Sequence, residues 1–205
     1  MLKAFIFDFD GVIIQSERVM FTILQDILKK EGVILPEQMY HLKVGRVMID
    51  FIHSLQLPGI NEEIKSKAIA GVYNEFRGNI EKHAKRIDHT INFIKNYKGD
   101  AVFAIGSMSV TSFIDKVLNI FEIRDKFKLI VSKDDITYQK PDPEIFNKCV
   151  EKLGVDKSEC MIFEDSTVGA QSAHAAGIKF SIILNGENNK EDFKDHLQPT
   201  KFIEK

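Results

Sequence analysis

The chain has 205 residues, of which 44% are hydrophobic and 28% are charged, and its formal net charge at pH 7 is -2. This length fits one domain, or a core domain with a smaller insertion, and the charge leaves no basic surplus for binding nucleic acid or a membrane surface. The apolar start is too short for a signal peptide, and no later stretch has the length of a membrane span, so we expect a cytoplasmic protein.

The first predicted element is a buried strand interrupted by two carboxylates. The apolar run from residue 5 to residue 13 contains Asp8 and Asp10, and Gly11 follows directly. Carboxylates are rarely buried without a partner, but at the end of a strand they emerge where open α/β sheets bind ligands. In an extended segment the two would point the same way, and their repulsion favours a bound cation or a retained proton. For this motif alone, a solvated strand end is the simpler alternative.

Residues 15–85 are predicted to be helical and contain no convincing strand. Ser16 can cap a first helix, whose apolar residues recur on one face as far as Gly32. Weaker helical patterning continues to about residue 80. We therefore expect an all-helical cap domain over 15–85, inserted into a core domain formed by residues 1–14 and 86–205.

From about residue 88, buried strands alternate regularly with helices. Strands are expected at 101–105, 129–131, 160–163 and 180–184. This alternation predicts the α/β class, with a doubly wound parallel sheet. Cys149 and Cys160 are expected to be small buried hydrophobes rather than a disulfide or a metal pair. The polar tail after Asn185 is expected to pack loosely.

Polar side chains follow several of the predicted strands. The carboxyl ends of parallel strands lie along one edge of a sheet, so these side chains should converge there. Carboxylates suit Mg²⁺ together with a substrate phosphate, and a hydroxyl and an ammonium could hold phosphoryl oxygens. Singly, Ser107 is explained as a helix cap and Lys140 as a surface lysine; together, the set favours a phosphoryl-transfer site. The set comprises Asp8, Asp10, Ser107, Lys140, Glu164 and Asp165.

Four motifs carry a resemblance to a known family. They are Phe7-Asp8-Phe9-Asp10-Gly11-Val12, Ile105-Gly106-Ser107, Lys140-Pro141-Asp142-Pro143-Glu144, and Ile162-Phe163-Glu164-Asp165-Ser166 with Gly169-Ala170 behind it. In this order they resemble the haloacid dehalogenase (HAD) superfamily of phosphotransferases. The resemblance is to the branch with a helical cap after the first strand, which includes β-phosphoglucomutase-like phosphatases. It implies a HAD-like, Rossmannoid core with an inserted helical cap.

The resemblance also implies a role for each motif residue. Asp8 would be the nucleophile that forms an aspartyl-phosphate, and Asp10 the general acid and base. Mg²⁺ would be held by Asp8, the backbone carbonyl of Asp10 and Asp165, with Glu164 close by or ligating through water. The phosphoryl group would be bound by Ser107, Lys140 and backbone N–H groups near Gly11 and Met108.

The chain departs from this family in the predicted cap. Met20 and Met48 stand where the mutases carry a histidine and an arginine, and Arg46 is either a substrate contact or a solvated residue. These departures favour a phosphatase acting on a small phosphorylated metabolite over a phosphomutase of the β-phosphoglucomutase type. A catalytically silent HAD-fold binding domain is the remaining alternative, and the complete motif set argues against it.

Overall fold

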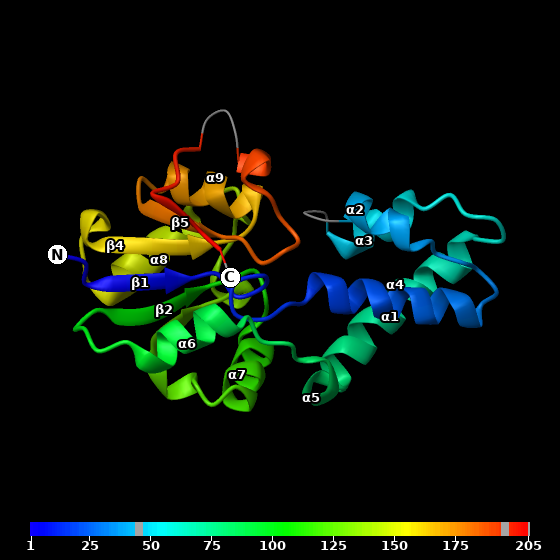
Figure 1. Cartoon of the computed structure of the whole chain (residues 1–205), viewed down its shortest axis with the longest axis horizontal. Helices are drawn as coiled ribbons and strands as arrows, with labels where there is room; N and C mark the ends of the chain where they lie inside the picture. Colours follow the sequence, from blue (N-terminus) through cyan, green and yellow to red (C-terminus); the bar gives the residue numbers. More distant parts are fainter. Residues whose placement is uncertain (44–46, 194–196, 205) are drawn as a thin grey trace. The chain divides into compact units, whose positions relative to one another are not determined.

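The computed structural model describes residues 1–43, 47–193 and 197–204. The chain divides into two compact units, of which one comprises Met1–Gln15 with Lys85–Lys205 and the other Ser16–Ala84. The first unit contains a β-sheet with helices, and the second is helical (Figure 1). The predicted α/β fold with a helical insertion after the first strand is confirmed.

The sheet has six strands in the order β3-β2-β1-β4-β5-β6, and every neighbouring pair is parallel. In the central strand, Phe7 lies opposite Ile105 on one side and Phe163 on the other. The residues that follow β1, β2 and β4 therefore emerge at the same edge. The strands are β1 Ala4–Phe7, β2 Val102–Gly106, β3 Phe127–Val131, β4 Cys160–Glu164, β5 Lys179–Ile183 and β6 Lys201–Ile203.

One face of the sheet packs against α8 and α9 through hydrophobic side chains, most of them aliphatic. Ala4 and Ile6 of β1 are fully buried in the same cluster as Phe146 of α8 and Ala170 of α9. Cys149 also lies in this cluster, and both cysteines are free and buried, as predicted. The helices of this unit are α6 Asp88–Asn96, α7 Thr111–Ile120, α8 Glu144–Leu153 and α9 Thr167–Ala175, with 3₁₀ turns at Arg124–Lys126, Lys133–Asp135, Lys157–Glu159 and Lys190–Phe193.

The opposite face of the sheet carries an aromatic cluster. Because side chains alternate along a strand, Phe5 and Phe7 of β1 point away from Ala4 and Ile6. The Phe7 and Phe163 rings are stacked with centroids 4.9 Å apart, and Phe93 of α6 meets Phe5 edge-on at 5.7 Å. Such contacts add to the burial of a large apolar area, so β1 is held firmly on both faces.

The helical unit is built around α1 and α4, which pack against each other. Ser16 occupies the N-cap position of α1, as expected, but its side chain makes no capping hydrogen bond, whereas Asn61 caps α4 by accepting from the Ile64 N–H at 2.9 Å. No strand occurs in the described parts of 16–84, residues 16–43 and 47–84. The helices are α1 Glu17–Lys30, α2 Tyr40–Lys43, α3 Met48–Ser54, α4 Glu62–Gly78 and α5 Ile80–His83, with a 3₁₀ turn at Glu37–Met39.

The segments at the two boundaries of the sheet-containing unit pair with each other. The Gln15 N–H donates to the Lys85 carbonyl at 2.7 Å, and the Ile87 N–H donates to the Ile13 carbonyl at 3.0 Å. Ile14 and Arg86 form an antiparallel bridge between them. The chain therefore leaves this unit and returns to it at adjacent points.

The prediction of a loosely packed tail after Asn185 is wrong. β6 pairs in parallel with β5, and Phe193 is only 3% exposed. The Phe193 and Phe202 rings meet with centroids 6.0 Å apart. Phe193 thus belongs to the buried core cluster, and Phe202 packs against that cluster. Within the described residues, no helix is both long and apolar enough to cross a membrane.

Candidate active site

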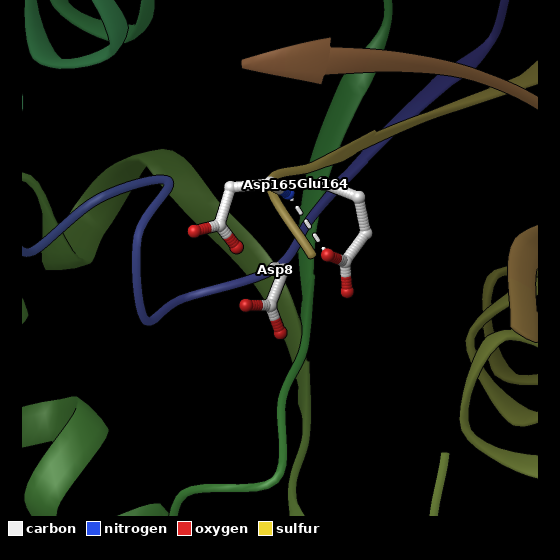
Figure 2. Close-up of side chains that lie close together, drawn as sticks. All are labelled: Asp8, Glu164 and Asp165. Atoms are coloured by element: carbon white, nitrogen blue, oxygen red, sulfur yellow. Dashed lines mark hydrogen bonds between the residues drawn. The ribbon is translucent and has the colours of Figure 1, made fainter. Parts of the chain in front are cut away.

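Three carboxylates meet at the carboxyl edge of β1 and β4. Asp8 directly follows β1, Glu164 is the last residue of β4, and Asp165 is the next residue (Figure 2). One oxygen from each lies within 4.8 Å of the other two. Asp8 is 7% exposed and Glu164 is fully buried, so both carboxylates need partners.

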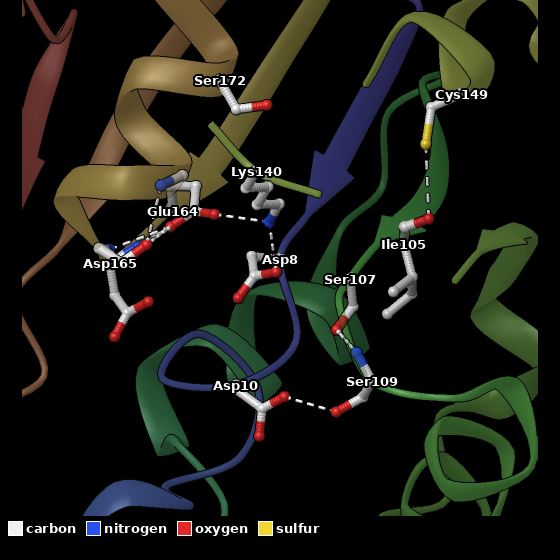
Figure 3. A network of polar contacts seen from close by, with 12 residues as sticks. Asp8, Asp10, Ile105, Ser107, Ser109, Lys140, Cys149, Glu164, Asp165 and Ser172 are labelled. Carbon is white, nitrogen blue, oxygen red and sulfur yellow. Dashed lines mark hydrogen bonds and ion pairs between the residues drawn. The ribbon is translucent and has the colours of Figure 1, made fainter. Parts of the chain in front are cut away.

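Lys140 provides the cationic partner. Its Nζ lies 2.7 Å from Asp8 Oδ1 and 2.7 Å from Glu164 Oε1, and its side chain is almost completely buried (Figure 3). Burial lowers the pKa of Lys140, but the two carboxylates outweigh this effect and raise the pKa above its ordinary value. The ammonium therefore remains charged at neutral pH.

The electrostatics around Asp8 favour a further cation. Burial raises the pKa of the Asp8 carboxyl to about 7; the charges of Glu164 and Asp10 act in the same direction, and Lys140 opposes them. Asp8 and Glu164 share the Lys140 ammonium, so with both carboxylates ionised these three side chains carry a net negative charge. A divalent ion bound by carboxylate oxygens would offset that charge.

Glu164 is held by more than its pair with Lys140. Its second oxygen, Oε2, accepts hydrogen bonds from the N–H groups of Asp165 and Ser166 at 2.9 and 3.0 Å and from the Ser166 hydroxyl at 3.0 Å. Gly169, in the first turn of α9, lies directly against it, because a Cβ built there would be 1.7 Å from Glu164 Oε1. The start of α9 therefore encloses this carboxylate and presents it to Lys140.

Asp10 lies outside the group of three carboxylates. β1 is shorter than the predicted apolar run and ends at Phe7, so Asp8 and Asp10 both lie after the strand. The Asp10 Oδ2 accepts a hydrogen bond from the Ser109 hydroxyl at 2.7 Å (Figure 3). Ser109 was not singled out by the sequence reasoning, although it lies in the polar loop that follows β2.

The residues predicted to bind the phosphoryl group or the substrate differ in burial and in hydrogen bonding. Ser107 is 1% exposed, and its hydroxyl accepts from the Ser109 N–H at 3.1 Å. The Gly11 N–H donates to the Ile14 carbonyl at 2.8 Å, so it closes a local turn. Met108 is half-buried and packs against the core. Arg46 lies outside the described residues.

Two asparagines after β5 reach the site and were missed. The Asn185 Nδ2 donates to Asp165 Oδ2 at 2.9 Å and to the Gly11 carbonyl at 2.8 Å. The Asn188 Nδ2 donates to the Asp165 carbonyl at 2.6 Å. The position of Asn185 shortly after a buried strand could have pointed to it, by the same rule that found the carboxylates.

The family model for haloacid dehalogenase-like hydrolases matches residues 5–183. The chain belongs to this family. It is 30% identical to "Putative phosphatase YhcW" of Bacillus subtilis over 96% of this chain and 90% of that protein. It is 26% identical to Hexitol phosphatase B of Escherichia coli K12 over 93% of this chain and 87% of that protein.

The fold agrees with solved structures of the HAD family. The haloacid dehalogenase-like family protein SP0104 from Streptococcus pneumoniae superposes with a TM-score of 0.80, at 16% identity, over 98% of this chain and 93% of that chain. The family and enzyme class predicted from the four motifs, a HAD-like phosphatase, are confirmed.

Proposed function

We propose that this HAD-like phosphatase is Mg²⁺-dependent and hydrolyses a small phosphorylated sugar or a similar metabolite through an aspartyl-phosphate on Asp8. The observation that carries this proposal is the placement of Asp8. Its carboxylate is buried at a strand end, 2.7 Å from an ammonium and within 4.8 Å of two further carboxylates. A nucleophile, a cationic partner for phosphoryl oxygens and hard oxygen ligands for a metal thus meet in one place.

The oxygen donors of the cluster fit a Mg²⁺ ion. Mg²⁺ prefers carboxylate oxygens together with water and phosphate oxygens, and the cluster offers carboxylate oxygens from three side chains. Asp8, Asp165 and the backbone carbonyl of Asp10 would hold the ion. Both oxygens of Glu164 already accept hydrogen bonds, so we assign it to the positioning of Lys140, next to the metal. When bound, the ion would neutralise charge on the phosphoryl oxygens.

We propose the following reaction for the side chains around Asp8. An Asp8 oxygen forms a bond to phosphorus while the bond from phosphorus to the ester oxygen breaks, and Asp10 gives that oxygen its proton. Asp10 then takes a proton from the water that attacks the aspartyl-phosphate, which releases phosphate and regenerates Asp8. Lys140 and Ser107 stabilise the charge on the phosphoryl oxygens.

The substrate class is supported by sequence and relatives. The similarity to Hexitol phosphatase B extends over most of both chains, which favours a phosphorylated sugar or sugar alcohol. Met20 and Met48 replace the two polar residues that the mutase branch carries in its cap. Hydrolysis is therefore favoured over return of the phosphoryl group to the sugar.

A panel of phosphorylated metabolites, assayed for phosphate release with Mg²⁺ and with a chelator, tests the proposal. We expect Mg²⁺-dependent release from at least one small sugar phosphate and none with Asp8→Asn. The matched control, Asp26→Asn on the exposed side of α1, should retain full activity. Turnover by Asp8→Asn would exclude the nucleophile assignment, and formation of an isomerised sugar phosphate in place of free phosphate would identify a mutase.

A further inference from the structure

We propose that Asn185 is a positioning residue for the metal site: its side-chain amide fixes the Asp165 carboxylate and so sets the affinity for the divalent cation. This inference rests on the proposed function, because it takes Asp165 as a metal ligand. Asn185 comes two residues after the end of β5 and is not part of any of the four motifs. It is 3% exposed, which is unusual for an asparagine.

Every polar atom of the Asn185 side chain has a partner. The Nδ2 group uses its two hydrogens for Asp165 Oδ2 at 2.9 Å and the Gly11 carbonyl at 2.8 Å. The Oδ1 atom accepts from the Glu187 N–H at 2.9 Å. Because two acceptors face one end of the amide and a donor faces the other, its orientation is determined by its surroundings.

The Asp165 carboxylate is confined from a second side by Gly11. A Cβ built on Gly11 would lie 1.8 Å from Asp165 Oδ2, so the carboxylate rests directly against the glycine backbone. Gly11 has a φ of +78°, a conformation that favours glycine. The oxygen that Asn185 binds thus lies between its amide and this backbone, and rotation of the carboxylate about the Cβ–Cγ bond is restricted.

Asn188 holds the backbone of the same aspartate. Its Nδ2 donates to the carbonyls of Asp165 at 2.6 Å and Ile183 at 2.9 Å, while its Oδ1 accepts from the Asn185 N–H at 3.2 Å. The loop after β5 therefore grips Asp165 at both its main chain and its side chain. Hydrogen bonds that orient a ligand in this way reduce the conformational freedom lost on binding a metal.

The test compares Asn185→Leu and the smaller Asn185→Ala with Asn189→Leu, a matched control in the same loop. Asn189 is exposed, and its backbone N–H donates to Asp192. The first measurement is the rise in melting temperature with MgCl2 alone, which reports binding to the folded state without turnover. The second is the Mg²⁺ dependence of p-nitrophenyl phosphate hydrolysis.

We expect both Asn185 variants to need about 10-fold or more additional Mg²⁺ for the same thermal shift and for half-maximal activity, in line with the usual effect of residues that orient metal ligands. At saturating Mg²⁺ their kcat should approach that of the wild type. An unchanged Mg²⁺ requirement, whether or not kcat is reduced, would overturn the role of Asn185 and leave the proposed function standing. If the wild type itself shows no response to Mg²⁺, the proposed function fails as well.

Discussion

Replacement of Gly169 by alanine probes how closely α9 encloses Glu164. A Cβ at this position would lie 1.7 Å from Glu164 Oε1 and 1.9 Å from its Cδ, and real Cβ contacts are essentially never closer than 3.0 Å. The fully buried carboxylate must therefore move. Any movement disturbs its 2.7 Å contact with Lys140, so the substitution should reach the site although it adds only a methyl group.

The expected magnitude follows from opposing contributions. Alanine gains about 1 kcal/mol of helix propensity over glycine. Against this gain stand about 1–3 kcal/mol for overpacking and about 1.5–3 kcal/mol for a charged hydrogen bond. We expect a net loss of about 3 kcal/mol, which for a protein of this size corresponds to a melting temperature lower by about 6–12 °C.

Thermal unfolding in chelator, together with phosphatase assays, checks this expectation. Gly78→Ala is the matched control, because a Cβ built at this last residue of α4 meets no described atom within 4 Å outside its chain neighbours and the nearby backbone of its own helix, and it should be neutral or slightly stabilising. In a Glu164→Ala background, the added methyl has room and Gly169→Ala should lose its penalty. If Gly169→Ala has the same melting temperature as the wild type and retains its activity, the steric argument is refuted.

Two further predictions concern Asp10 and Asp8. Ser109→Ala removes the 2.7 Å hydrogen bond to Asp10, and we expect kcat to fall about 10-fold with little change in KM. The control is Ser112→Ala, at an exposed position of α7. Equal kcat values for the two variants would contradict the role of Ser109. In metal-free protein, burial raises the pKa of Asp8 to about 7 from its usual 3.8, so the folded state binds this proton more tightly than the unfolded state. Between about pH 4 and pH 7, the stability of the wild type relative to Asp8→Asn should therefore fall as pH rises. Urea unfolding of both proteins at about pH 5 and about pH 8 measures this change. If the difference in unfolding free energy between the wild type and Asp8→Asn is the same at both pH values, the prediction is contradicted.

The core of the site could be predicted because its residues occupy strand ends. Asp8, Glu164 and Asp165 each follow or end a run of buried residues, and the parallel order of strands makes such positions neighbours. The periodicity of the sequence indicates where each strand ends, and the sheet topology then determines which strand ends are neighbours. Lys140 follows no strand, and although it was included in the predicted set, its contacts with Asp8 and Glu164 depend on the conformation of the loop that carries it.

The parts that were missed depend on loop conformation. The position of Asn185 after a predicted strand indicates the correct edge of the sheet, but its contact with an aspartate twenty positions earlier depends on the conformation of its loop. Gly169 follows the fourth motif and was quoted with it, but its close approach to Glu164 is seen only in the structure. β6 has three residues, too few for alternation to identify a strand.

The paired boundary segments have a consequence for how such enzymes can diversify. The chain leaves the sheet-containing unit after Gln15 and returns at Lys85, and these residues are joined by a 2.7 Å hydrogen bond. An insertion whose ends meet can be exchanged for another without stretching the scaffold that receives it. All the residues assigned above to bond-making, proton transfer and metal binding lie outside that insertion. Recombination at this junction could therefore supply a different helical unit and leave these residues unchanged.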